Sequence, residues 1–183
     1  MTKKISVFGG SLPKPGSDTY NLAYELGKGL GSAGMTVMTG GYMGTMEATS
    51  RGASEAGGHV IGVTSEEIEA WRPVGPNKWV AEEWRCETLQ ERLNSLVEDC
   101  DGAITLPGGI GTLLEVCLLW NQLAVDILDP KPLILIGERW HKVMQTFYNE
   151  FGDYVSLESR EYISFAQDPQ SAVELLNHFF GFS

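Results

Sequence analysis

Five short apolar runs that alternate with longer helical segments constrain the fold of this chain most. Each run is rich in valine, isoleucine or other apolar residues, as strands buried on both faces of a parallel sheet are. The expected strands are Ile5–Phe8, Met35–Met38, Val60–Val63, Ala103–Leu106 and Leu133–Ile136. The expected helices are Tyr20–Leu30, Met43–Ala56, Thr88–Val97, Thr112–Leu123, His141–Phe151 and Ala172–Phe180. This alternation predicts right-handed βαβ units and therefore a doubly wound α/β sheet, mainly parallel, with helices on both faces.

The length and the net charge of the chain limit the number of its domains and the kinds of ligand it can bind. The chain has 183 residues, which fits a single domain spanning 1–183. It carries 13 Lys and Arg against 24 Asp and Glu, a formal net charge of −11. Binding of a nucleic-acid backbone depends on many Lys and Arg residues, so we expect no nucleic-acid partner. A small phosphate would have to be held mostly by backbone N–H groups.

The cysteines and the N-terminus favour a cytoplasmic protein. Cys86, Cys100 and Cys117 match neither a short zinc spacing nor a complete disulfide framework, so we expect reduced thiols in the core. The apolar run near the N-terminus is too short for the core of a signal peptide or for a membrane span. We therefore expect no membrane association.

The stretch 65–84 interrupts the strand–helix rhythm. It contains Trp71, Trp79 and Trp84, together with two prolines and a glycine. Two interpretations stay open: a long surface loop or lid, and an irregular connection packed by its own aromatic side chains.

Three glycine-rich turns follow expected strands, at 9–11, 40–44 and 107–112. Open parallel sheets bind ligands beyond the carboxyl ends of their strands, where glycine allows close approach and helix N-termini present free N–H groups. The predicted phosphate-binding residues are Gly10, Ser11, Gly40, Gly41, Gly44, Gly108, Gly109, Ile110, Gly111 and Thr112. The chain has neither a full dinucleotide fingerprint nor a P-loop. A monophosphate therefore fits better than a metal-bound triphosphate.

Two charged residues stand within apolar helical patterns. Glu115 is flanked by leucine, valine, cysteine and tryptophan, in a helix so apolar that we expect it to be buried. A buried carboxylate there is unfavourable unless it is paired with a cation or has a function. The alternative is that Glu115 simply complements the helix dipole. Arg92 lies at the edge of the apolar stripe formed by Leu89, Leu93 and Leu96. It could reach over the sheet to an anion or to Glu115, but snorkelling is the favoured interpretation.

The run 107–115, PGGIGTLLE, resembles the PGGxGTxxE motif of the LOG family, the phosphoribohydrolases long labelled "possible lysine decarboxylase". The resemblance extends from Ile5 to about Ile136, and Arg92 stands where the family carries its catalytic arginine. Three positions depart from the family pattern: Thr39, Leu93 and Leu114.

The resemblance implies a Rossmann-like fold, a homodimer, and hydrolysis of the N-glycosidic bond of a purine or cytokinin nucleoside 5′-monophosphate. Glu115 would stabilise the oxocarbenium-like sugar and activate water, and Arg92 would orient the substrate or stabilise developing charge. The glycine amides and the Thr112 hydroxyl would hold the phosphate. No metal and no cofactor is expected. The alternative is a nucleotide or molybdenum-cofactor carrier without catalysis. Lysine decarboxylation is rejected, because neither of the two later glycine turns contains the lysine that a pyridoxal Schiff base needs.

Overall fold

A computed structural model describes residues 2–182, which form one sheet with helices packed around it. The strands are β1 Lys4–Phe8, β2 Thr36–Thr39, β3 Val60–Ser65, β4 Glu82–Cys86, β5 Gly102–Thr105, β6 Leu133–Ile136 and β7 Ile163–Ala166. The helices are α1 Asp18–Ser32, α2 Thr45–Glu55, α3 Glu66–Trp71, α4 Leu89–Glu98, α5 Ile110–Ala124, α6 Glu138–Phe151, α7 Leu157–Glu161 and α8 Pro169–Phe180, with a 3-10 turn, η1, at Gly152–Tyr154.

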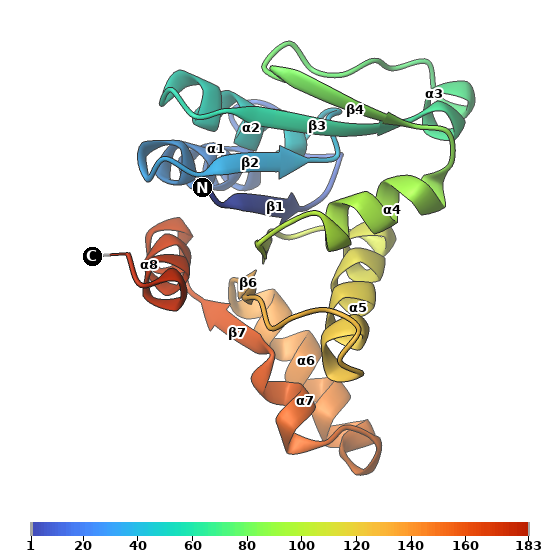
Figure 1. The fold of residues 1–183 in the computed structure, drawn as a ribbon, viewed down its shortest axis with the longest axis vertical. Coiled ribbons are helices and arrows are strands. Elements are labelled where there is room, and N and C mark those ends of the chain that lie inside the picture. Colours follow the sequence, from blue (N-terminus) through green and yellow to red (C-terminus); the bar gives the residue numbers. More distant parts are fainter. Residues whose placement is uncertain (1, 183) are drawn as a thin grey trace.

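The sheet confirms the doubly wound, Rossmann-like prediction. Its seven strands lie in the order β4-β3-β2-β1-β5-β6-β7, and every neighbouring pair is parallel. In Figure 1 the strands run from β4 at the top of the view to β7 toward the bottom. The chain winds outward in one direction from β1 to β4 and in the other from β5 to β7. The direction reverses between β1 and β5, where Phe8 lies opposite Thr105. In sheets of this kind ligands bind at that reversal point.

Side-chain alternation divides the core into two layers. Ile5 and Val7 of β1 pack with α1, α2 and α8 on one face, whereas Phe8 packs with α4, α5 and α6 on the other. Successive side chains of a strand point to opposite faces, so a strand with apolar residues at nearly every position needs helices on both sides. All five predicted strands therefore form as buried central strands.

The two strands that sequence patterning missed are β4 and β7. Strand β4, with sequence EEWRC, lies at the edge of the sheet and is mostly exposed. Edge strands often carry charged residues that discourage pairing with other chains, so β4 lacks the apolar signature of a buried strand. Strand β7, at the other edge, is buried only at Ile163 and Ala166.

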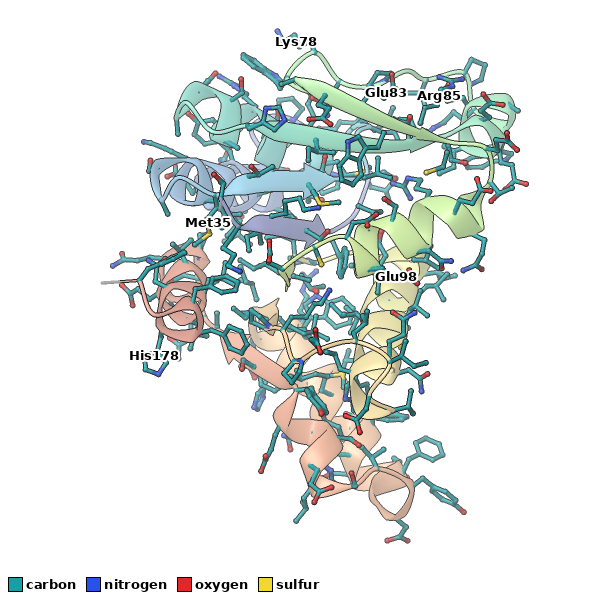
Figure 2. All side chains as sticks on the ribbon, viewed as in Figure 1. Met35, Lys78, Glu83, Arg85, Glu98 and His178 are labelled. Carbon is teal, nitrogen blue, oxygen red and sulfur yellow. The ribbon has the colours of Figure 1, made fainter. Side chains whose placement is uncertain are left out.

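The stretch 65–84 is more ordered than either interpretation predicted. It contains the end of β3, all of the short helix α3 and the beginning of β4, with an irregular connection between the two. Arg85 of β4 holds α3 in place through ion pairs with Glu66 at 3.2 Å and Glu69 at 2.8 Å. Figure 2 shows Arg85 and Glu83 together near the end of β4 that adjoins α3.

One expectation about burial was wrong, and another stays a prediction. In the single chain, Leu113 and Leu114 of helix α5 are 42% and 47% exposed, so burial of this helix on every side would need a partner copy. Of the three cysteines, which are all unpaired, only Cys100 lies in the core, whereas Cys117 is exposed. In the described residues, no helix has both the length and the apolarity that crossing a membrane would require.

Candidate active site

A cavity of about 760 Å³ opens at the reversal point between β1 and β5. Its walls come from the turns after both strands and from the first turn of α5, together with parts of α3, α4 and α6. It contains both charged residues that the sequence singled out, Arg92 and Glu115. The structure therefore brings together, at one place, the motif residues that lie on separate elements.

Arg92 is held from α4 across the ends of two strands. Its Nε donates to the carbonyl oxygen of Val63 at 2.8 Å, and its Nη2 donates to that of Gly40 at 3.1 Å. The guanidinium carbon also lies 5.6 Å from the centre of the Tyr42 ring. The residue is only 8% exposed, so the favoured prediction that Arg92 snorkels into solvent was wrong. Burial lowers the pKa of Arg92, and the nearby charge of Glu115 acts in the opposite direction. Arginine remains protonated even so.

Helix α4 has a well-defined start, which fixes where Arg92 points. Thr88 accepts a hydrogen bond from the backbone N–H of Glu91, and the Glu91 carboxylate accepts one from the N–H of Thr88 in return. This reciprocal cap satisfies two N–H groups that would otherwise lack a partner at the helix start. The inward face of the helix then buries Arg92 beside Leu93 and Leu96.

Glu115 lies on the cavity wall in the second turn of α5. Its carboxylate can be reached from the cavity, but protein surrounds it on most sides, and this burial raises its pKa to about 7. The charge of Arg92 lowers the pKa by a smaller amount. The first turn of α5 contains no acidic residue, and the helix dipole acts mainly within that turn. The geometry thus favours a functional carboxyl over one that serves the helix dipole.

No hydrogen bond or ion pair within 4.0 Å joins Arg92 to Glu115 in residues 2–182. Both side chains face the same cavity, and each influences the pKa of the other. A carboxyl whose pKa lies near neutrality, beside a fixed cation in a cavity, is typical of acid–base sites in enzymes.

The first and third glycine turns meet at Gly10. Its N–H donates to the carbonyl of Pro107 at 3.2 Å, which joins the turn after β1 to the turn after β5. Gly10, Ser11 and all five predicted residues from Gly108 to Thr112 line the cavity. Helix α5 begins after Gly109 without a side-chain cap, so its first N–H groups have no partner within the helix, and the residues that carry them line the cavity. Such a helix start is suited to an anion.

The glycines of the second turn support the site from behind and do not line it. Gly44 adopts a φ of 74°, and a Cβ there would lie 2.5 Å from the carbonyl oxygen of Gly10. Both the N–H and the hydroxyl of Thr45 donate to that same oxygen, at 2.9 and 3.0 Å. Gly40, as the acceptor for Arg92, acts on the site through that side chain. Of the predicted phosphate-binding residues, Gly40, Gly41 and Gly44 therefore lie outside the cavity lining.

Several residues of the cavity wall were not among the predicted site residues. Tyr42 and Met46 come from the second glycine turn and α2, Ile68, Trp71 and Arg72 from α3 and the residue after it, and Arg139 from α6. Asn77, outside the wall, donates from its side-chain amide to the carbonyls of Gly41 and Tyr42 at 3.0 and 2.9 Å. Met46 belongs to the pattern of the second glycine turn, Tyr42 lies within that turn, and Arg139 follows an expected strand, so these positions carried a signal. The other residues belong to no recognisable spacing pattern.

Comparisons with known proteins agree with this geometry. Residues 46–176 match the family described as possible lysine decarboxylase. The chain is 30% identical, over 139 residues, to a cytokinin riboside 5′-monophosphate phosphoribohydrolase of Rhodococcoides fascians, covering 74% of this chain and 68% of that protein. It is also 30% identical over 158 residues to the rice protein cytokinin riboside 5′-monophosphate phosphoribohydrolase LOG, covering 85% of this chain and 61% of that protein.

Among solved structures, the chain is similar to a molybdenum cofactor binding protein from the phototrophic bacterium Rippkaea orientalis. That similarity has a TM-score of 0.78 and 26% identity, and it covers 98% of both chains. The chain is thus similar in sequence to proteins named as phosphoribohydrolases and similar in structure to a protein named as a molybdenum cofactor binder.

Proposed function

Because this chain belongs to the LOG family, also labelled possible lysine decarboxylase, we propose that it is a nucleoside 5′-monophosphate phosphoribohydrolase. The reaction adds water across the N-glycosidic bond of an AMP-like purine or cytokinin nucleotide, giving the free base and ribose 5-phosphate. The observation that carries this proposal is the presence of Glu115, with a pKa of about 7, and of Arg92 in one cavity with the start of α5.

Glu115 has the properties that this hydrolysis needs. As the bond between the sugar and the base breaks, positive charge develops on the sugar, and a nearby carboxylate stabilises it. A carboxylate whose pKa is close to neutrality also accepts a proton from the attacking water more readily than an ordinary glutamate does. That proton then passes from Glu115 to the departing base, so the sugar gains the hydroxyl of water, the base gains its hydrogen, and the overall reaction needs no further reactant.

Arg92 acts as a fixed cation. Its bonds to Val63 and Gly40 hold the guanidinium in one orientation, which limits the reorganisation that accompanies catalysis. We propose that it orients the substrate or stabilises charge that develops on it. The phosphate would lie at the start of α5, held by the amides of Gly108 to Thr112 and by the Thr112 hydroxyl, with Gly10 and Ser11 opposite.

The label lysine decarboxylase does not fit the cavity. A pyridoxal enzyme holds its cofactor through a lysine Schiff base. No lysine lines this cavity in residues 2–182.

A carrier that binds a nucleotide or the molybdenum cofactor without catalysis is the second candidate, and the 26% identity to a molybdenum cofactor binding protein supports it. Incubating the purified protein with AMP distinguishes the two candidates. The hydrolase releases free adenine and ribose 5-phosphate, which chromatography separates from AMP. AMP that binds and is recovered unchanged contradicts the hydrolase and favours the carrier.

We also propose a homodimer, as the family resemblance implies, with the segments Thr88–Val97 and Thr112–Leu123 at or near the interface. The exposed side of α5 carries Leu113 and Leu114, and Val125 follows the last residue of the helix; together they form an apolar surface that a partner copy would cover. This surface continues toward α6, since Trp120 contacts Phe147 edge to face at a centroid distance of 6.0 Å. Residues 1–183 would act as one nucleotide-binding domain in the cytoplasm, and the net charge of −11 argues against a nucleic-acid partner.

A further inference from the structure

Arg139 is a cation on the cavity wall for which residues 2–182 provide no hydrogen-bond or ion-pair partner. Three arginines line the cavity. Arg92 donates to two backbone carbonyls. The guanidinium of Arg72 lies 5.7 Å from the Trp71 ring centre, although its buried Nε donates to no group in residues 2–182. Arg139 is exposed to the cavity and makes no side-chain hydrogen bond, ion pair or aromatic contact with any of residues 2–182.

The local structure does not favour a cation at this position. Arg139 is the second residue of α6, at the positive end of the helix dipole, where acidic residues are favoured and basic ones are not. The acidic residue beside it, Glu138, pairs with Lys142 at 3.7 Å and leaves Arg139 free. Acidic residues outnumber basic ones by 24 to 13 in this chain, yet none is placed against Arg139. Residues that break a local rule without compensation are often functional.

The first turn of α6 is fixed to the glycine turn at the start of α5. Trp140, the next residue, is 7% exposed and donates from Nε1 to the carbonyl of Leu106 at 3.0 Å. Leu106 directly precedes the turn that begins with Pro107 and Gly108. Strands β5 and β6 are neighbours in the sheet, so α5 and α6 both begin at its carboxyl edge. Arg139 and the amides at the start of α5 therefore face the same cavity from adjacent elements.

We propose that Arg139 binds the phosphate of the substrate and makes this site selective for nucleoside monophosphates over nucleosides. The inference rests on the proposed function in that the ligand is a nucleoside 5′-monophosphate. Backbone amides supply neutral donors, whereas the guanidinium of Arg139 adds a full charge and two parallel donors that match a phosphate dianion. The same charge would be of no use to a ligand that lacks the phosphate.

The test measures binding of AMP and of adenosine to Arg139→Ala, Arg139→Lys and the wild type by calorimetry. Charge-assisted hydrogen bonds of this kind predict that Arg139→Ala weakens AMP binding by about 10- to 100-fold and leaves adenosine binding within about twofold. Arg139→Lys should recover part of the AMP affinity, because it restores the charge without the paired donors. Ribose 5-phosphate, which carries the phosphate but no base, should lose affinity as AMP does.

Lys142→Ala is the matched control. It removes the same charge one turn further along α6, from a side chain that is 74% exposed and does not line the cavity. It should leave both affinities unchanged. Where turnover is measurable, Arg139→Ala should raise the KM for AMP much more than it lowers kcat, a split that a purely structural defect would not produce.

The results separate this inference from the proposed function. AMP affinity within about twofold of the wild type in Arg139→Ala, or equal losses for AMP and adenosine, overturns the role of Arg139 even if hydrolysis is intact. A phosphate-specific loss in a protein that releases no adenine supports Arg139 and rejects the hydrolase. Failure of the wild type to bind AMP, phosphate or ribose 5-phosphate rejects both.

Discussion

Gly40 and Arg92 are 52 positions apart in the chain, yet the carbonyl oxygen of the first accepts a hydrogen bond from Nη2 of the second at 3.1 Å. A Cβ at Gly40 would overlap the guanidinium group of Arg92. The glycine therefore serves the site by leaving room for the arginine, and it does not contact the cavity itself. This close approach explains a glycine that sequence analysis assigned to phosphate binding.

The first prediction tests this relationship. Gly40→Ala should displace the Arg92 side chain, because guanidinium and methyl group cannot occupy the same space. Misplacing a catalytic group by about 1 Å can lower the rate on the order of a hundredfold, so AMP hydrolysis should fall by at least about tenfold. Gly75→Ala is the control, since a Cβ there meets no atom within 4 Å. Equal activity of the two variants would show that the position of Arg92 does not matter.

The second prediction concerns Glu115 as a catalytic group. Glu115→Gln preserves the size of the side chain and removes its charge, so nucleotide binding should survive while adenine release falls by on the order of a hundredfold or more. The measurement is AMP hydrolysis by both proteins, with AMP binding alongside. Glu98→Gln, which changes an exposed acid of α4 outside the cavity, should retain full activity. A fully active Glu115→Gln variant would favour the carrier.

The third prediction is a pH-dependent stability change at the same residue. Burial raises the pKa of Glu115 to about 7 in the folded protein, against 4.5 for an ordinary glutamate. A raised pKa means that its contribution to stability is fully present below pH 4.5 and is lost as the pH rises through 7. Glu115→Gln lacks this loss, so its free energy of unfolding relative to the wild type should increase between pH 5 and pH 8.

One pKa unit corresponds to about 1.4 kcal/mol, and water in the cavity should reduce the whole effect to on the order of 1–2 kcal/mol. Urea unfolding of both proteins at several pH values measures it. A variant that is less stable than the wild type by a constant 0.3–1 kcal/mol or so at every pH would instead indicate a role in the helix dipole. The pH profile of kcat/KM should show a rising limb with an apparent pKa near 7 if Glu115 acts as a base.

The fourth prediction concerns the homodimer. Light scattering at micromolar concentration should give twice the mass of the chain. Leu114→Glu places a charge on the exposed apolar side of α5 and should shift the protein toward the monomer. Leu175→Glu, on α8, makes the same change at a residue that is 36% exposed and should leave the mass unchanged. A wild type that scatters as a single chain would reject the dimer.

The sequence by itself determined the central strands and the glycine turns that border the cavity. Five strands are apolar on both faces, a pattern that only a parallel sheet covered by helices satisfies, and the glycine turns follow from their positions after β1, β2 and β5. The motif that ends in Glu115 also places that carboxyl on the helix that follows β5. These features depend on local spacing, which a sequence displays directly.

Only the tertiary structure decided which groups each polar side chain contacts and how deeply it is buried. The position of Arg92 at the edge of an apolar stripe predicted a side chain that extends to the surface. Only the packing of α4 over the ends of β2 and β3 buries it against Gly40 and Val63. The pKa of Glu115 likewise depends on how much protein surrounds the carboxyl, which is a property of the cavity and not of the helix. Likewise, only the three-dimensional arrangement of residues 2–182 leaves the Arg139 side chain on the cavity wall without a hydrogen bond or an ion pair. Electrostatic energy depends on distance and burial in three dimensions, so spacing along the chain cannot predict it.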